Sequence, residues 1–131
     1  MSSIFTKIIK GEIPCYKIGE TEKSFAFLDI SPLHSGHTLV VPKKEVDYIF
    51  DLAEEDYQDL MAFSKVVAHA VGKAIPSTRV GVAVIGLEVP HAHVHLIPID
   101  SVSDIDFSRP KMQFSAEDME AYAEKIRSYL S

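Results

Sequence analysis

The chain has 131 residues, the length of one ordinary domain, and we expect a single domain over residues 1–131. Hydrophobic residues make up 47% and charged residues 24%, which excludes a disordered chain. The net charge of −6 and the lack of a basic run argue against nucleic acid as a partner. A single cysteine fits a reducing compartment, and we find no apolar stretch long enough for a signal peptide or a membrane span. We therefore expect a cytoplasmic protein that does not bind membranes.

The first part of the chain predicts one short helix and three strands. Ser3 is suited to cap a helix from residue 4 to about residue 10, which Gly11 ends. Strands are predicted over residues 16–19, 24–29 and 37–42. In the second strand the residues alternate, so that two faces form: Phe25 and Phe27 on one, Ala26 and Leu28 on the other.

The second part predicts a long helix, two strands and a last helix. A helix is expected over residues 52–74, because apolar residues recur there at steps of three and four. Strands are expected over residues 79–85 and 91–97, followed by a polar loop over 101–110. Ser115 is suited to cap the last helix, whose apolar face holds Met119, Tyr122, Ala123, Ile126 and Leu130. Because neighbouring strands are joined by short links, we predict one antiparallel sheet in an α+β fold.

Three histidines alternate along the last predicted strand. His91, His93 and His95 fall on one face of it, roughly 6–7 Å apart along the chain, while the residues between them face the core. A buried row of unpartnered imidazoles would be costly, so the row marks either an exposed edge face or a site of chemistry.

Two kinds of chemistry fit this row. Imidazoles are common ligands of zinc, and the nearby Glu88 offers a carboxylate to complete such a site. Imidazole is also a nucleophile and a proton carrier near neutral pH, and its neighbours would then orient the attacking ring and donate to phosphate oxygens. The spacing alone does not choose between them.

The segment from His91 to Ile97, His-Ala-His-Val-His-Leu-Ile, matches the motif His-φ-His-φ-His-φ-φ, where φ is apolar. The sequence here resembles the histidine triad (HIT) family. Residues 4–14, 25–32 and 36–43 are similar to the opening helix and the second signature region of that family, and the resemblance covers roughly residues 3–98. It implies a five-stranded antiparallel sheet with a long central helix and short terminal helices, in a homodimer that joins two sheets into one of ten strands.

The resemblance also implies an activity. Family members bind purine nucleotides and cleave the bond between the α-phosphorus and a leaving group, and they need no cofactor. Their substrates are nucleoside phosphoramidates, aminoacyl adenylates and dinucleoside polyphosphates, and the product is a nucleoside monophosphate. A nucleotide hydrolase or nucleotidyl transferase that takes a purine nucleotide conjugate is therefore expected.

Roles for single residues follow from the same resemblance. His93 would be the nucleophile that forms a nucleotidyl-histidine, His91 would fix its ring, and His95 and His37 would contact phosphate oxygens or the leaving group. Asp29 would hold the ribose hydroxyls, unless it only caps a turn. The residues that would line the base pocket are Phe5, Ile8, Phe27 and Ile30, each of which also suits a plain core position.

The sequence departs from the family pattern in two places. Some members hold a structural zinc through two cysteines and two histidines, but Ser3, Thr6 and Glu45 stand at three of those positions, so we predict no metal. Before the triad, Leu87 and Glu88 replace a polar Gln-Ser or Gln-Thr pair. Glu88 is then either a residue that tunes substrate choice or a solvated loop glutamate.

Two competing functions stay open at this point. The altered loop before the triad favours a module that binds nucleotides without turning them over. The histidine row itself is compatible with zinc held by His91, His93 and His95. The sequence leaves the leaving group, the choice between adenine and guanine, and the contacts of the C-terminal helix undetermined.

Overall fold

The structure is a computed structural model that describes residues 2–130, so Met1 and Ser131, the two ends of the expected domain, lie outside it. It has three α-helices, five strands and two short 3-10 helices in the described residues. The α-helices are α1 (Ile4–Ile9), α2 (Glu54–Ala74) and α3 (Ala116–Arg127). The strands are β1 (Lys17–Glu20), β2 (Ser24–Leu28), β3 (Thr38–Pro42), β4 (Arg79–Ala83) and β5 (Val94–Ile99), and the 3-10 helices are η1 (Ile49–Asp51) and η2 (Val102–Ile105).

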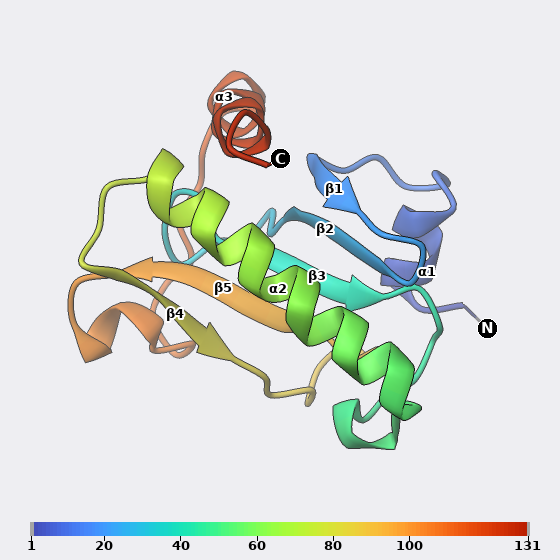
Figure 1. Cartoon of the computed structure of the whole chain (residues 1–131). Helices are drawn as coiled ribbons and strands as arrows, with labels where there is room; N and C mark the ends of the chain where they lie inside the picture. The colour runs from blue at the N-terminus through green and yellow to red at the C-terminus, as the bar shows by residue number, and fades with distance from the viewer. Residues whose placement is uncertain (1, 131) are drawn as a thin grey trace.

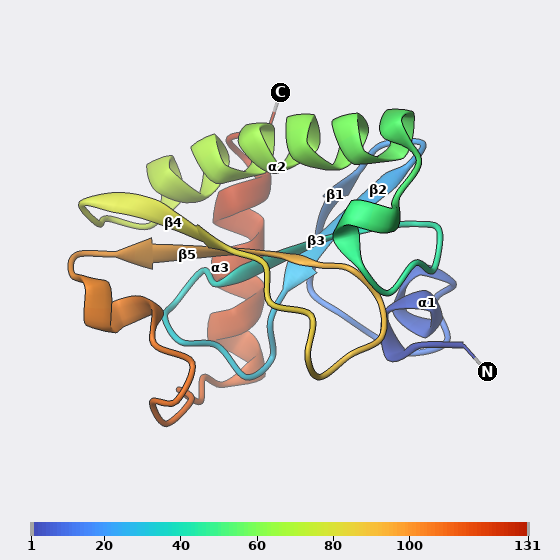
Figure 2. The same ribbon diagram turned by 90° about the horizontal axis from the view of Figure 1, so that it is seen from below.

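The strands form one antiparallel sheet in the order β1-β2-β3-β5-β4, as the sequence predicts. Helix α2 lies across one face of this sheet (Figures 1 and 2). Its predicted apolar stripe packs against alternate residues of the three central strands. The buried residues at this contact include Ala26, Leu28, Val40, Leu60, Val67, Val71, Val94 and Leu96. Burial of this apolar surface is the main force that holds helix and sheet together.

The opposite face of the sheet carries a second, smaller apolar cluster. This phenylalanine cluster consists of Phe5, Ile8, Phe25, Phe27, Leu39 and Val41. Figure 2 shows α1 and the segment that follows β5 on this side, away from α2. The alternation of β2 is confirmed, since its phenylalanines face this cluster and its other two apolar residues face α2.

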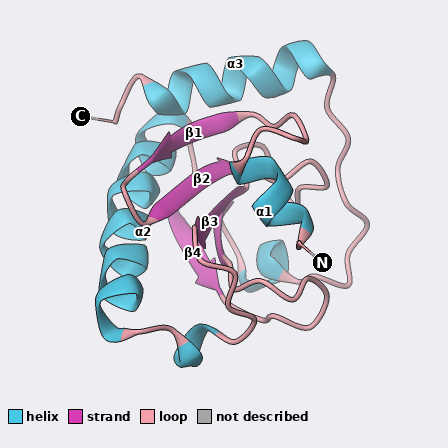
Figure 3. Ribbon diagram, turned by 90° about the vertical axis from the view of Figure 1, so that its right-hand side faces the viewer, coloured by secondary structure: helices cyan, strands magenta, loops and turns pink. Residues whose placement is uncertain are grey.

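Helix α3 packs on the chain's own core, which answers a question that the sequence leaves open. It runs along the β1 end of the sheet and contacts both β1 and α2 (Figure 3). Met119, Ala123 and Ile126 are buried there, and Ser115 caps the helix by accepting the N–H of Asp118. No helix within residues 2–130 is long and apolar enough to cross a membrane.

The last strand differs from its predicted bounds at both ends. It begins at Val94 rather than at residue 91, because the carbonyl of Pro42 accepts the side chain of His91 and Pro42 has no N–H to continue the ladder. It also runs through Pro98, which pairs with Val80 of β4 beyond the last pair with β3, so only one neighbouring strand is present there.

Several other boundaries shift by a few residues. Helix α2 begins at Glu54, after the 3-10 turn η1, and β4 ends at Ala83. The turn η2 lies inside the segment predicted as a loop, where Ser101 and Asp104 cap each other's backbone. These local hydrogen bonds do not change the hydrophobic period, which is why the pattern of apolar residues does not reveal them.

Candidate active site

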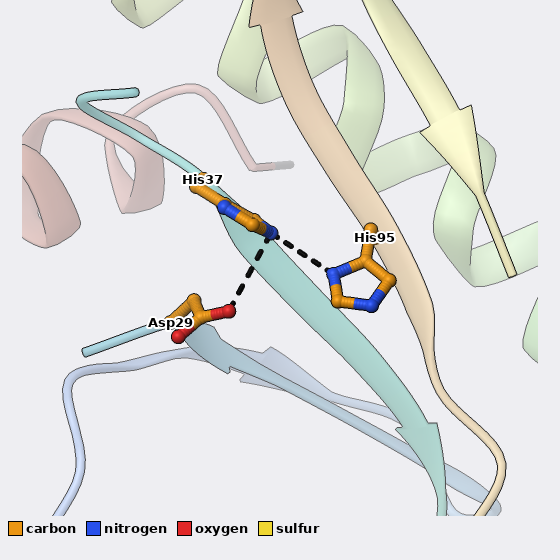
Figure 4. Close-up of side chains that lie close together, drawn as sticks. All are labelled: Asp29, His37 and His95. Carbon is orange, nitrogen blue, oxygen red and sulfur yellow. Dashed lines mark hydrogen bonds and ion pairs between the residues drawn. The ribbon is translucent and has the colours of Figure 1, made fainter. Parts of the chain in front are cut away.

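Three side chains meet on the face of the sheet that carries the phenylalanine cluster: Asp29 directly after β2, His37 directly before β3 and His95 within β5 (Figure 4). Leu39 of β3 pairs with His95 of β5, and the N–H of Asp29 donates to the carbonyl of His37 at 2.9 Å. This register places the Nε2 atom of His37 3.0 Å from Nδ1 of His95 and 3.6 Å from Oδ2 of Asp29. Two residues on the ends of neighbouring strands and one within β5 therefore form one cluster.

The hydrogen bonds of this cluster fix where the protons of its two imidazoles lie. The backbone N–H of Leu33 donates to Nδ1 of His37 at 3.0 Å, so the proton of that ring is on Nε2. From there it is donated to Nδ1 of His95, and the proton of His95 is then on its own Nε2. That nitrogen has no hydrogen-bond partner in the described residues. Among these residues, every side-chain nitrogen or oxygen that is closed off from solvent has a partner, so Nε2 of His95 is open to solvent. His95 thus presents an N–H to anything that enters.

His91 is held in the same tautomer as His37 and His95, whereas His93 is held in the opposite one. The Nε2 of His91 donates to the carbonyl of Pro42 at 2.7 Å, and its Nδ1 accepts from the hydroxyl of Ser3, also at 2.7 Å. The Nδ1 of His93 donates to the carbonyl of His91 at 2.8 Å. The proton of His93 is therefore on Nδ1, and Nε2 carries a free lone pair.

These rings lie together on one side of the segment. The ring of Phe5 stands edge-on to His91 and His93, with centroids 5.7 and 5.0 Å away, and the rings of His93 and His95 are 4.9 Å apart. Ala92 points the other way, into the core under α2. The ring that carries the free lone pair and the ring that carries the free N–H are thus neighbours.

Burial keeps two of these rings neutral at pH 7. It lowers the pKa of His37 to about 3 and that of His95 to about 4, with a smaller contribution from the neighbouring imidazoles. Burial also lowers the pKa of His91, and it raises the pKa of Asp29 against the opposing effect of the Ser31 N–H bond. Neutral His37 and His95 can each serve as a donor and an acceptor at once.

The HIT domain model matches residues 10–102, more than half of the chain and the whole of this cluster. The chain belongs to the HIT family. Along its sequence it is 37% identical over 130 residues to a Schizosaccharomyces pombe protein named adenosine 5'-monophosphoramidase hnt1, with 98% of each chain covered. It is also 42% identical over 96 residues to a Saccharomyces cerevisiae protein named adenosine 5'-monophosphoramidase HNT1. That match covers 72% of this chain and 61% of the yeast protein.

Solved structures of HIT proteins share the fold. A Hit-like protein from Bartonella henselae has a TM-score of 0.85 and 31% identity, covering 98% of this chain and 97% of its own. A zinc-bound histidine triad protein from Mycobacterium smegmatis has a TM-score of 0.83 and 26% identity, covering 99% and 94%. The predicted family and the α+β fold with a five-stranded antiparallel sheet are confirmed.

In this HIT protein the residues at the structural zinc positions do not fit that metal. The N–H of Ser3 and the hydroxyl of Thr6 each donate to Oε1 of Glu45 at 2.7 Å, and the hydroxyl of Ser3 donates to His91. Zinc prefers thiolate and imidazole ligands, and here two neutral hydroxyls stand in their place, already bonded to their neighbours. A closed hydrogen-bond network therefore ties α1 to the triad.

The triad itself is also poorly suited to a metal. His91 has both ring nitrogens committed, so the zinc site proposed for His91, His93 and His95 lacks a ligand. The ligand atoms of Asp29, His37 and His95 do lie within 4.8 Å of one another. However, Nε2 of His37 carries a proton as long as Leu33 donates to Nδ1, so that nitrogen has no lone pair to give.

The predicted substrate-binding residues do not all lie together in the structure. Phe5, Ile8 and Phe27 are buried in the phenylalanine cluster beside the imidazoles, whereas Ile30 is 73% exposed and outside it. Asp29 caps the turn, because its Oδ1 accepts the N–H of Ser31, and its Oδ2 lies 3.6 Å from Nε2 of His37. Glu88 is exposed in the loop before β5, and its charge contributes to the raised pKa of Asp29.

A cavity of about 230 Å³ opens beside the same loop. It is lined by Tyr48, Phe50, Ile85 and Ala92, among others. Its wall includes Ile49 and Ala92, which belong to the core under α2, and also His93 of the triad.

Sequence reasoning missed Phe107, which lies over the histidines. Its ring is 4.7 Å from that of His95 and 6.3 Å from that of His37. It comes from the segment predicted as a polar loop, and one aromatic residue in such a loop gives no periodic signal. The sequence predicts Ser3 as a helix cap and places it at a position that matches a zinc ligand in some family members, but it does not predict the hydrogen bond from Ser3 to His91.

Proposed function

We propose that this HIT protein is a nucleotide hydrolase or nucleotidyl transferase that cleaves at the α-phosphorus of purine nucleoside phosphoramidates. One observation carries the proposal: the Nδ1–H of His93 is held by the carbonyl of His91, which leaves the Nε2 lone pair free beside the N–H of His95. The relatives named adenosine 5'-monophosphoramidase support the choice of substrate. The sole cysteine, Cys15, supports a reducing compartment such as the cytoplasm.

The proposed reaction steps follow from which ring nitrogens of His93 and His95 carry a proton. In the first step Nε2 of His93 attacks the α-phosphorus, and the bond from phosphorus to the leaving nitrogen breaks. That nitrogen departs with its electron pair and takes a proton from a water molecule, which becomes hydroxide, while neutral His95 donates a hydrogen bond from Nε2 and keeps its own proton. In the second step the hydroxide attacks the nucleotidyl-histidine, and the electron pair of the bond from phosphorus to nitrogen returns to Nε2 of His93. The products are the nucleoside monophosphate and the free amine.

The nucleoside is proposed to lie between Asp29 and the phenylalanine cluster. The carboxylate of Asp29 would accept hydrogen bonds from the ribose hydroxyls, since it is an acceptor at the rim of the histidine cluster. The base would pack against Phe5, whose ring already touches two of the triad imidazoles. Ile30 and Glu88, both exposed, would contact substrate only at the outer edge of such a pocket.

A substrate panel tests this function directly. Adenosine and guanosine phosphoramidates, an aminoacyl adenylate and a dinucleoside polyphosphate are incubated with the protein, with and without a chelator, and the nucleoside monophosphate is measured. We expect release from the phosphoramidates that the chelator does not change. Binding of AMP without any turnover would instead support the non-catalytic module, and loss of turnover on chelation would support a zinc enzyme.

We also propose that the protein is a homodimer formed through β4. This strand is at the edge of the sheet and has one unpaired side, to which a second β4 can add in antiparallel fashion to make ten strands. Val82, Val84 and Ile85, at and just after this strand, are exposed to 56%, 39% and 48%. A partner would bury these side chains, which are unusually apolar for a free edge.

A further inference from the structure

The segment between η2 and α3 forms one wall of the histidine cluster. Phe107 packs edge-on against His95. Five residues later, the N–H of Met112 donates to the carbonyl of Pro32 at 2.8 Å, which ties the segment to the turn that carries Asp29. Residues 107–112 are thus anchored at both ends, once on the triad and once beside the proposed ribose site. Figure 2 shows this stretch on the side of the sheet opposite α2.

Lys111 lies between these two anchors. Its Nζ donates to the carbonyl of Phe107 at 2.7 Å and to that of Arg109 at 3.4 Å, and it stands 5.9 Å from the centre of the Phe107 ring. Both partners are neutral, and no salt bridge of Lys111 is found in residues 2–130. An ammonium group has three N–H donors, so Lys111 keeps at least one, and its whole charge, for another group.

The charge of Lys111 affects the pKa values of all three residues of the cluster formed by Asp29, His37 and His95. Burial is the largest influence on all three groups: Lys111 opposes the rise that burial gives the pKa of Asp29 and adds to the fall that burial gives the pKa values of His37 and His95. Arg109, the other cation of this segment, is instead paired with Asp104 at 3.2 Å. The site therefore combines neutral His37 and His95 rings with one nearby cation that has no carboxylate partner.

We propose that Lys111 is a substrate-binding residue whose ammonium group binds a phosphoryl oxygen of the nucleotide. Neutral imidazoles can donate hydrogen bonds to a phosphate but cannot balance its charge, whereas an ammonium does both. The carbonyl of Phe107 accepts from the ammonium group of Lys111 and holds it beside the histidine cluster, while the ring of Phe107 packs against His95. This proposal rests on the proposed function, since it assigns a binding residue to the same site.

Binding measurements on Lys111→Gln test it, with Lys73→Gln as the matched control. Lys73 is an exposed lysine in the last turn of α2, on the other side of the sheet. Calorimetric titration with AMP and with adenosine separates the phosphate from the rest of the ligand. We expect the Kd for AMP to rise about tenfold in Lys111→Gln and the Kd for adenosine to change less than twofold. Lys111→Arg keeps the charge and should recover most of the AMP affinity.

Each outcome decides a separate question. If the unchanged protein binds no AMP, the proposed function itself fails. If it binds AMP and Lys111→Gln binds AMP equally well, the inference is overturned while the proposed function stands. An equal loss for AMP and adenosine would also overturn it, because that result indicates a structural role. Higher salt should weaken AMP binding more in the unchanged protein than in Lys111→Gln.

Discussion

The side chain of His93 donates to the main-chain oxygen of His91, two residues before it, at 2.8 Å. His91 in turn is held at both ring nitrogens, by Pro42 and by Ser3. The attacking ring is therefore oriented by the backbone of a residue that is itself locked to β3 and to α1. Displacement of His91 should move His93 as well, although His91 touches no reacting atom.

Ser3→Ala tests this support. The substitution removes the bond to His91 together with the cap of α1, and we expect turnover to fall about tenfold with little change in KM. Ser115→Ala is the matched control, because it removes the cap of α3 far from the triad. Each variant should lose about 1 kcal/mol of unfolding free energy. Equal activity of the two variants would contradict a positioning role for Ser3.

His95→Ala tests whether the hydrogen bond from His95 assists the departure of the leaving nitrogen. We expect turnover of adenosine phosphoramidate to fall by about 10²–10⁴, because its nitrogen needs a proton to leave. A nitrophenyl ester of AMP has a leaving group that departs as an anion, so its turnover should fall far less. A kinetic comparison of the two substrates measures the difference. The same loss with both would mean that His95 only binds the phosphate.

The buried imidazoles predict a pH-dependent stability. His37 and His95 have pKa values of about 3 and about 4 in the folded protein, against about 6.5 in an unfolded chain. Below pH 6.5 the unfolded state binds more protons, so their contribution is complete above that pH and is lost as the pH falls toward 4. We expect the unfolding free energy to drop by a few kcal/mol between pH 6.5 and 4.5, as measured by denaturant titration.

His37→Gln should reduce this pH dependence, because one of the two depressed groups is removed. Asp29 acts in the opposite direction near pH 4, since its pKa is raised in the folded protein. The comparison is therefore restricted to pH 4.5 and above. A variant with the same slope as the unchanged protein would show that His37 is not the source.

The free edge of β4 predicts the effect of a charge on assembly. Val82→Lys places an ammonium group where the proposed dimer buries a valine, so we expect a monomer in light scattering after gel filtration. Val66→Lys is the control, because Val66 is similarly exposed, at 47%, but lies on α2. A Val82→Lys protein that stays dimeric, or an unchanged protein that is already monomeric, would contradict the proposal.

Much of the fold could be predicted from the period of the apolar residues. The stripe of α2 identifies the buried face of that helix, and the alternation of β2 separates its two faces, one buried against α2 and the other in the phenylalanine cluster. The alternation of His91, His93 and His95 likewise places their rings on one side, even though only the last of them lies in a regular strand.

The remaining features depend on contacts between distant parts of the chain. Ile30 has the composition of a pocket residue, yet it follows Asp29 into a turn and is exposed. The bonds from Ser3 to His91 and from Met112 to Pro32 join segments that no local pattern connects. Phe107 and Lys111 are single residues in a polar loop, so their place at the triad emerges only from the folded structure.

Capture of the covalent intermediate tests the central claim most directly. The protein is mixed with adenosine phosphoramidate in a single turnover, quenched in base, digested and analysed by mass spectrometry. We predict an adenylyl group on the peptide that holds the triad, attached to Nε2 of His93. An adduct on any other residue, or full release of AMP from a His93→Ala protein, would contradict this account.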